Sequence, residues 1–215
     1  MKSPVLIFAC ILVFYAHSLS AQEMKTITLP RPQIDIGKPL MQALNERKST
    51  REFSPRTLPL QELSNLLWAA CGVNRPDQGN RRTAPTAMNC QEIDVYVALE
   101  NGLYLYNAPD HVLEQVLPED IRAATGRQDF VAHAPLNLVF VSDYAKFRKS
   151  PPEVKDFYSA TDTGFVSQNV YLYCASQGLA TVVRNLVDKP ELEKVMKLRT
   201  DQKVILTQTV GYPED

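Results

Sequence analysis

The stretch ATDTGFVSQNVYLYCASQG, residues 160–178, decides the fold of this chain. One helical stripe carries Val166, Val170, Tyr173, Cys174 and Gln177, and beside it lie Phe165, Leu172 and Ala175. A helix that is apolar on nearly every side is stable only when other elements cover it, so we expect it at the centre of the protein. Gly178 can end this helix, because glycine readily adopts the backbone conformation found at helix C-termini.

Helices and strands occur in mixed order around this central helix. Apolar residues at helical spacing predict helices over 39–48, 60–71 and 188–198, and two short helices over 117–135. Strands are predicted in EIDVYVALE (92–100), LNLVFVSD (136–143), LATVV (179–183) and KVILTQTVGYP (203–213), and Asn101-Gly102 predicts a hairpin. The expected class is α+β, with a single mixed or antiparallel sheet flanked by helices.

The first 21 residues have the pattern of a secretory signal peptide. Lys2 precedes a 12-residue apolar run, VLIFACILVFYA (5–16), and the small and polar residues HSLSAQ follow it. The run is short for a membrane span, which needs about 20 apolar residues. We therefore expect residues 1–21 to be a removable leader, residues 22–215 to form a single domain, and the protein to be secreted across the inner membrane into the periplasm.

Charge and cysteine content argue against several classes of function. The formal charge is −1 at pH 7, and removal of Lys2 with the leader makes it −2. Positive and negative residues are interspersed, so no nucleic-acid or anionic-membrane surface is indicated. Outside the leader the cysteines are Cys71, Cys90 and Cys174, an odd number without C-x-x-C spacing, and no disulfide framework is implied. No metal-ligand spacing and no second apolar run of membrane length occur.

A basic cluster follows the first predicted helix, in ERKSTREF, residues 46–53. Arg47 and Lys48 have an explanation without any ligand, because cations in the last turn of a helix are stabilised by its dipole by roughly 0.3 to 1 kcal/mol. Arg51 lies beyond the helix end and is not explained in this way. The residues alone leave two interpretations open, a solvated helix end or an anion site that also uses Ser49.

Two further segments could line a cofactor. Residues Arg81–Gln91, RRTAPTAMNCQ, include Asn89 and Gln91, whose carboxamides both donate and accept hydrogen bonds. Residues 177–186, QGLATVVRNL, pass from the central helix into a strand, where free backbone N–H groups could face a flat heteroaromatic ring. Each segment also has a plain structural interpretation, the first as a solvated loop before a strand and the second as a helix-to-strand turn.

The chain carries no motif for a catalytic nucleophile or a metal. It has no Ser/His/Asp arrangement, no phosphate-binding G-x-x-x-x-G-K and no dinucleotide fingerprint G-x-G-x-x-G. We therefore expect no catalytic side chain, and if the protein is an enzyme, a cofactor performs the difficult step.

Taken together and in this order, the motifs resemble those of the nitroreductase-like family of FMN-dependent oxidoreductases. They are R-x-S-x-R (47–51), LPLQELSNLLWAACGV (58–73), PTAMN (85–89), the long helix ending in Gly-Leu (178–179) and VGYP (210–213). The resemblance covers nearly all of the chain after the leader. LPRP (29–32), ELSNLLWAACG and RRTAP are most similar to the azoline-dehydrogenase branch, although the Lys-Tyr pair of that branch is absent.

The resemblance implies an α+β homodimer that binds FMN at its subunit interface. The phosphate would be held by Arg47, Lys48, Ser49 and Arg51. The isoalloxazine and ribityl chain would be lined by Pro85, Thr86, Ala87, Met88 and Asn89, and the reactive edge, with a backbone N–H near flavin N5, would lie close to Val183, Arg184 and Asn185. The implied activity is hydride transfer through flavin N5 to a small conjugated or aromatic acceptor, with NAD(P)H or another reductant as the donor.

Two other functions remain open on the sequence. NADH and NADPH are scarce outside the inner membrane, so an exported protein of this kind could be a non-catalytic periplasmic flavin-binding protein. A domain for protein interaction without any cofactor is a third possibility, and it predicts that FMN leaves the melting temperature unchanged.

Overall fold

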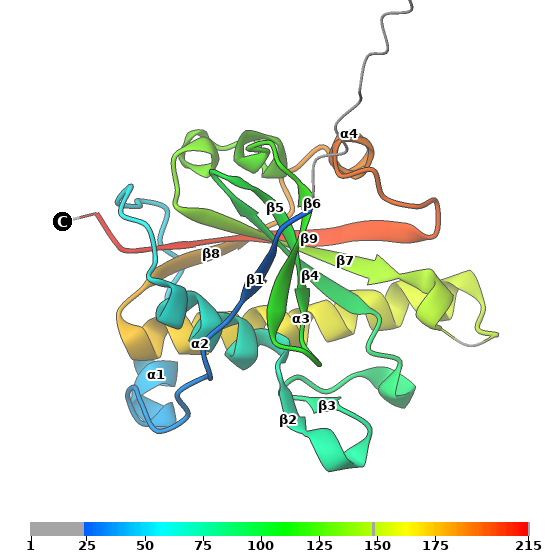
Figure 1. The fold of residues 1–215 in the computed structure, drawn as a ribbon, viewed down its shortest axis with the longest axis horizontal. Coiled ribbons are helices and arrows are strands. Elements are labelled where there is room, and N and C mark those ends of the chain that lie inside the picture. Colours follow the sequence, from blue (N-terminus) through cyan, green and yellow to red (C-terminus); the bar gives the residue numbers. More distant parts are fainter. Residues whose placement is uncertain (1–23, 148, 215) are drawn as a thin grey trace, which may run out of the picture.

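The computed structural model describes residues 24–147 and 149–214, and the leader expected over residues 1–21 lies outside them (Figure 1). Its centre is a seven-stranded sheet in the order β1-β6-β5-β4-β7-β9-β8, with every neighbouring pair antiparallel. The strands are β1 (Thr26–Thr28), β4 (Ile93–Leu99), β5 (Gly102–Asn107), β6 (Val112–Leu117), β7 (Leu136–Asp143), β8 (Ala180–Arg184) and β9 (Gln202–Gly211). A separate hairpin consists of β2 (Val73–Arg75) and β3 (Arg81–Arg82).

Helices cover both faces of the seven-stranded sheet. The α-helices are α1 (Leu40–Glu46), α2 (Leu60–Cys71), α3 (Pro152–Gln177) and α4 (Lys189–Val195). The short 3₁₀ helices are η1 (Pro76–Gln78), η2 (Ala87–Asn89), η3 (Arg122–Thr125), η4 (Asp129–Ala132) and η5 (Tyr144–Lys146). Figure 1 shows α1, α2 and α3 on one face, with α4 and the short helices of residues 122–132 on the other. The domain therefore has three layers.

Strand β4 illustrates how one sheet supports two apolar cores. Val95 and Val97 face the core that contains α2 and α3, whereas Tyr96 and Ala98 face the core that contains α4. Successive side chains of a strand point to opposite faces, so a strand buried on both faces is apolar at nearly every position.

The expected α+β class, with a sheet flanked by helices, is confirmed, and the sheet is antiparallel throughout. Helix α2 and the β4–β5 hairpin lie where the sequence predicts them. Gly178 caps α3 with a φ of 73°, as expected for the glycine after a helix end. Strands β1, β2, β3 and β6 were not predicted, and α1 ends two residues before Lys48.

Helix α3 is buried along one face and exposed along the other. It begins at Pro152, ahead of the stretch that predicts it, because proline fits the first turn of a helix. Val166, Val170 and Cys174 lie in the core, whereas Phe165 on the opposite side is 43% exposed. The expectation of a helix buried at the centre of the protein is therefore wrong: α3 lies on one face of the sheet and is buried only on the side that packs against the core.

Cys71 and Cys174 belong to the core between the sheet and helices α2 and α3. Burial raises the pKa of the Cys71 thiol to about 11 and raises that of Cys174 as well. Both thiols are therefore protonated at neutral pH and behave as small apolar side chains.

Candidate functional site

Tyr171, on the buried face of α3, joins two of the three predicted segments. Its hydroxyl lies 2.8 Å from Ser49 Oγ in the basic cluster and accepts a hydrogen bond of 2.9 Å from the backbone N–H of Val183 in β8. The backbone N–H of Thr50 also donates to the carbonyl of Thr181, at 3.0 Å. Residues 47–51 therefore run beside β8, the edge strand of the sheet.

The helix-end explanation accounts for only one cation of the basic cluster. Helix α1 ends at Glu46, so Arg47 is the capping residue and Lys48 lies beyond the helix. Stabilisation by a helix dipole falls off within the last turn. Glu46 is an acidic neighbour, but it is paired with Lys38, whose Nζ lies 2.5 Å from its carboxylate.

The cations of the basic cluster form no ion pair within the part of the chain that the structure describes. Across residues 24–147 and 149–214, none of the ion pairs involves Arg47, Lys48 or Arg51. The guanidinium carbon of Arg47 lies 5.4 Å from the centre of the Tyr171 ring, which places this cation beside the Ser49 hydroxyl. Guanidinium, ammonium and hydroxyl groups are the donors that bind phosphate in proteins, so this donor set fits a phosphate group.

The second segment is a tight loop in an unusual backbone conformation. Met88, Asn89 and Gln91 have φ values of 54°, 53° and 50°. A left-handed conformation costs roughly 1 to 2 kcal/mol for each residue that is not glycine. Two hydrogen bonds hold the loop, one of 2.9 Å from the N–H of Ala87 to Asp162 Oδ2 and one of 2.9 Å from the N–H of Gln91 to Thr86 Oγ1.

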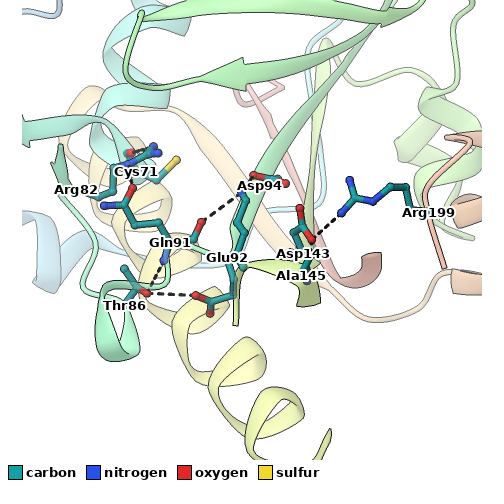
Figure 2. A network of polar contacts seen from close by, with 10 residues as sticks. Cys71, Arg82, Thr86, Gln91, Glu92, Asp94, Asp143, Ala145 and Arg199 are labelled. Atoms are coloured by element: carbon teal, nitrogen blue, oxygen red, sulfur yellow. Dashed lines mark hydrogen bonds and ion pairs between the residues drawn. The ribbon is translucent and has the colours of Figure 1, made fainter. Parts of the chain in front are cut away.

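A pair of buried carboxyl groups lies beneath this loop. Glu92 is fully buried, and its Oε2 accepts a hydrogen bond of 3.2 Å from Thr86 Oγ1 (Figure 2). Burial raises the pKa of Glu92 to about 7, and the neighbouring Asp162 adds to this shift by accepting a hydrogen bond from the protonated Glu92 and by its negative charge. Burial and a nearby negative charge both disfavour the ionised form of a carboxyl group. Glu92 therefore stays protonated well above the usual pH range of a glutamate.

The loop 85–89 contacts α3 far from the Tyr171 contact. Asp162 and Tyr171 are nine residues apart, which corresponds to about 13.5 Å along an α-helix and to a rotation of about 180°. One chain therefore presents the loop 85–89 and the pair of segments around Tyr171 on opposite sides of α3.

Residues 183–185 point in different directions. The Arg184 side chain is buried on the face of β8 away from α3, where it donates to the Thr125 carbonyl at 2.9 Å and to Asn137 Oδ1 at 3.1 Å. Burial lowers the pKa of Arg184 to about 10. The guanidinium group therefore lies in the core, and only the backbone of Arg184 can contact a ligand on the α3 side. Asn185, by contrast, is exposed.

The sequence did not reveal Tyr171, Glu92 or Asp162 as parts of this region. Asp162 offered a signal, because it shares a helical stripe with the buried residues Val166 and Val170. A carboxylate on a buried stripe needs a partner, here the backbone of the loop. No sequence pattern pointed to Tyr171, because tyrosines are common on helices that pack against a core.

No helix in the described part of the chain is long and apolar enough to cross a membrane. Within the same residues, no group of three or more histidine, cysteine or acidic side chains could hold a metal ion.

Comparison with known proteins places the chain in a family. Residues 44–212 match the model of the nitroreductase family, and the chain belongs to this family. A candidate nitroreductase of Methanocaldococcus jannaschii is 30% identical over 184 residues, which are 81% of this chain and 91% of that protein. The protein is accordingly an oxidoreductase of the nitroreductase family, whose members generally bind flavin.

Solved structures share the fold. The crystal structure of a candidate nitroreductase from Ralstonia eutropha has a TM-score of 0.84 and 48% sequence identity, and the match covers 88% of this chain and 90% of that one. An NADPH:FMN oxidoreductase from Vibrio harveyi, in complex with NAD⁺, has a TM-score of 0.62 and 16% identity, with 82% of this chain and 69% of that one covered. The second likeness concerns the fold alone.

Proposed function

We propose that this protein is an FMN-dependent oxidoreductase and that Arg47, Lys48, Ser49 and Arg51 bind the FMN phosphate. The observation that carries the proposal is that Arg47 and the Ser49 hydroxyl contact the same tyrosine, in a run of three cations (Arg47, Lys48 and Arg51) that form no ion pair among the described residues. Hydrogen bonds to a charged group contribute roughly 1.5 to 3 kcal/mol each. Membership of the nitroreductase family supports the same cofactor, and the Vibrio harveyi structure with this fold is named for FMN.

The cofactor would lie at the interface of a homodimer. Two observations support this arrangement: the loop 85–89 and the phosphate cluster contact opposite sides of α3, and helices α1 and α3 expose large apolar side chains. Met41 is 75% exposed and Phe157 is 65% exposed. Large apolar side chains left exposed on these two helices are what a surface covered by a partner chain would show. The loop of one chain would then reach the cofactor held by the cluster of the other.

When bound, FMN would supply hydride transfer through flavin N5 to a small conjugated or aromatic acceptor, with NAD(P)H or another reductant as the donor. The residues of the chain would hold the cofactor in a fixed position. Residues 85–89 would line the ring and the ribityl chain, in a loop held by Asp162 and Thr86. Tyr171 fixes the N–H of Val183, so the backbone near the reactive edge cannot shift freely. Rigid placement of two reactants lowers the entropic part of the barrier.

The leader supports export across the inner membrane to the periplasm, and the motifs LPRP and RRTAP support a place near the azoline-dehydrogenase branch. Because NADH and NADPH are scarce outside the inner membrane, the candidate electron donors of an exported protein include other reductants. We do not assign azoline oxidation to this protein, because it lacks the Lys-Tyr pair of the azoline-dehydrogenase branch.

Absorption spectroscopy of the purified protein tests the proposal directly. A protein that remains colourless after incubation and refolding with FMN contradicts it. If FMN binds, anaerobic photoreduction followed by a panel of quinones and nitroaromatics separates enzyme from carrier. Reoxidation faster than that of free FMN supports turnover, and reoxidation at the rate of free FMN supports a flavin-binding protein.

A further inference from the structure

A cavity of about 440 Å³ lies between the β2–β3 hairpin and the loop 85–89. Its lining contains the three arginines of the hairpin, Arg75, Arg81 and Arg82, and four residues of the loop between Pro85 and Asn89. This volume is within the range of small-molecule sites. The arginine side chains of the hairpin and the loop 85–89, which we propose contacts the cofactor, therefore line the same cavity.

Two of the three guanidinium groups are held in place by neutral acceptors. Arg75 donates from Nε to Asn74 Oδ1 at 3.0 Å and from Nη2 to the Arg82 carbonyl at 2.9 Å. Arg82 donates from Nε to Gln91 Oε1 at 3.0 Å and from Nη1 to the Cys71 carbonyl at 3.1 Å (Figure 2). These contacts fix the orientation of both groups without neutralising their charge.

No carboxylate lines this cavity, and no ion pair among the described residues involves the three arginines. Asp94, an acidic group close enough to influence Arg82, is paired with Lys146 at 2.5 Å. Beneath the loop, burial raises the pKa of Glu92 to about 7, which favours the uncharged form of this carboxyl group. Fixed cations without a protein counter-charge are the usual donors for a carboxylate or phosphate.

We propose that this cavity binds the anionic group, a carboxylate or a phosphate, of the small molecule that exchanges electrons with the cofactor. The inference rests on the proposed function, which places the loop 85–89 against the flavin. A molecule anchored by the arginines would share that loop with the ring and would therefore lie beside it. FMN itself has one phosphate, for which the cluster around Ser49 provides donors elsewhere in the chain.

The test compares two probes that differ in charge and hardly in shape, 4-nitrobenzoate and 4-nitrobenzamide. Equilibrium binding of each probe to the FMN-loaded protein is measured by calorimetry. We expect the benzoate to bind at least about tenfold more tightly than the amide, since hydrogen bonds to a charged partner contribute roughly 1.5 to 3 kcal/mol each. This preference should weaken as the salt concentration rises, because salt screens exposed charges.

The second part of the experiment substitutes the exposed Arg81. Arg81→Gln should weaken benzoate binding by about tenfold and leave the binding of the amide and of FMN unchanged. Arg75→Gln should act in the same direction. Arg127→Gln is the matched control, because Arg127 is an exposed arginine paired with Asp188, away from the cavity. Circular dichroism confirms that each variant is folded.

Two results would overturn the inference. One is equal affinity of the wild-type protein for the two probes. The other is a loss of FMN affinity in Arg81→Gln that matches its loss of benzoate affinity, because the cavity would then hold the cofactor. If the protein binds no FMN, the proposed function fails first, and the same probe pair on the cofactor-free protein still decides whether the arginines form an anion site.

Discussion

The hydroxyl of Ser49 lies 2.8 Å from the hydroxyl of Tyr171, which is 122 residues further along the chain. The same tyrosine hydroxyl accepts the N–H of Val183. One buried side chain on α3 therefore positions both the basic cluster and the edge strand. If FMN binds where we propose, Tyr171 acts through these two neighbours as a positioning residue.

Arg51→Ala should reduce FMN affinity by about a factor of ten or more, because it removes hydrogen bonds between a guanidinium and a phosphate. Titration of FMN fluorescence measures the dissociation constant. Arg56→Ala is the matched control, since its guanidinium carbon lies 4.1 Å from the centre of the Tyr212 ring, outside the cluster. A solvated surface arginine predicts instead a change within about 0.5 kcal/mol in both variants.

Tyr171→Phe should destabilise the cofactor-free protein by about 1 to 3 kcal/mol, because it removes an acceptor and leaves the N–H of Val183 without this partner. Urea unfolding measures the change without any cofactor. Tyr158→Phe serves as the control, since Tyr158 is on the same helix, its ring packs against Phe157, and its hydroxyl has no hydrogen-bond partner in the described chain. Equal stability of the two variants would show that the Tyr171 hydroxyl positions nothing.

Glu92→Gln should change the pH dependence of folding. The pKa of Glu92 is about 7 in the folded protein, against an ordinary value of 4.5. Between these values the folded state binds more protons than the unfolded state, so this residue makes the free energy of unfolding fall as the pH rises. The amide of glutamine does not ionise, and it can still donate to Asp162. The variant should therefore gain stability relative to wild type between pH 5 and 8, by about 1 to 3 kcal/mol.

Urea unfolding of the wild-type protein and of Glu92→Gln, each at pH 5 and at pH 8, measures this difference. Glu100→Gln is the control, because Glu100 is an exposed glutamate just beyond β4. A difference between wild type and Glu92→Gln that does not change with pH would mean that Glu92 is ionised throughout the range.

Phe165→Glu should convert the proposed homodimer into single chains. Phe165 is 43% exposed on α3, and a charge placed in a covered apolar surface loses its hydration. Light scattering after size-exclusion chromatography gives the mass of the assembly. Met24→Glu, at a similarly exposed apolar residue ahead of β1, should leave the mass unchanged. A wild-type protein with the mass of one chain contradicts the homodimer at once.

Local signals were sufficient for much of the fold. Pro59 and Gly72 delimit α2, and Asn101-Gly102 turns the hairpin, because these residues act on the backbone within a few positions. The central helix was also evident from its apolar stripes. Its full length was not, because the first seven residues of the helix, 152–158, begin with Pro152 directly after Pro151 and include charged side chains.

Strand β6 escaped prediction for a physical reason. Its buried positions are Leu113, Gln115 and Leu117, while Val112 and Val116 are only partly buried, so polar and apolar residues do not alternate as in a half-buried strand. Gln115 is buried because its side-chain oxygen accepts the N–H of Lys25, which helps to hold β1 at the edge of the sheet. Such a long-range partner is invisible in a window of sequence.

The sequence by itself determined the α+β class, the presence of the long helix α3 and the three segments of the proposed site, because spacing and turn residues act locally. Only the tertiary structure decided how these segments are used. It placed Ser49 against Tyr171, turned the Arg184 side chain into the core, and brought Glu92 to Asp162 beneath the loop. These relationships depend on contacts between residues up to 122 positions apart, and such contacts are set by the packing of α3 against the sheet.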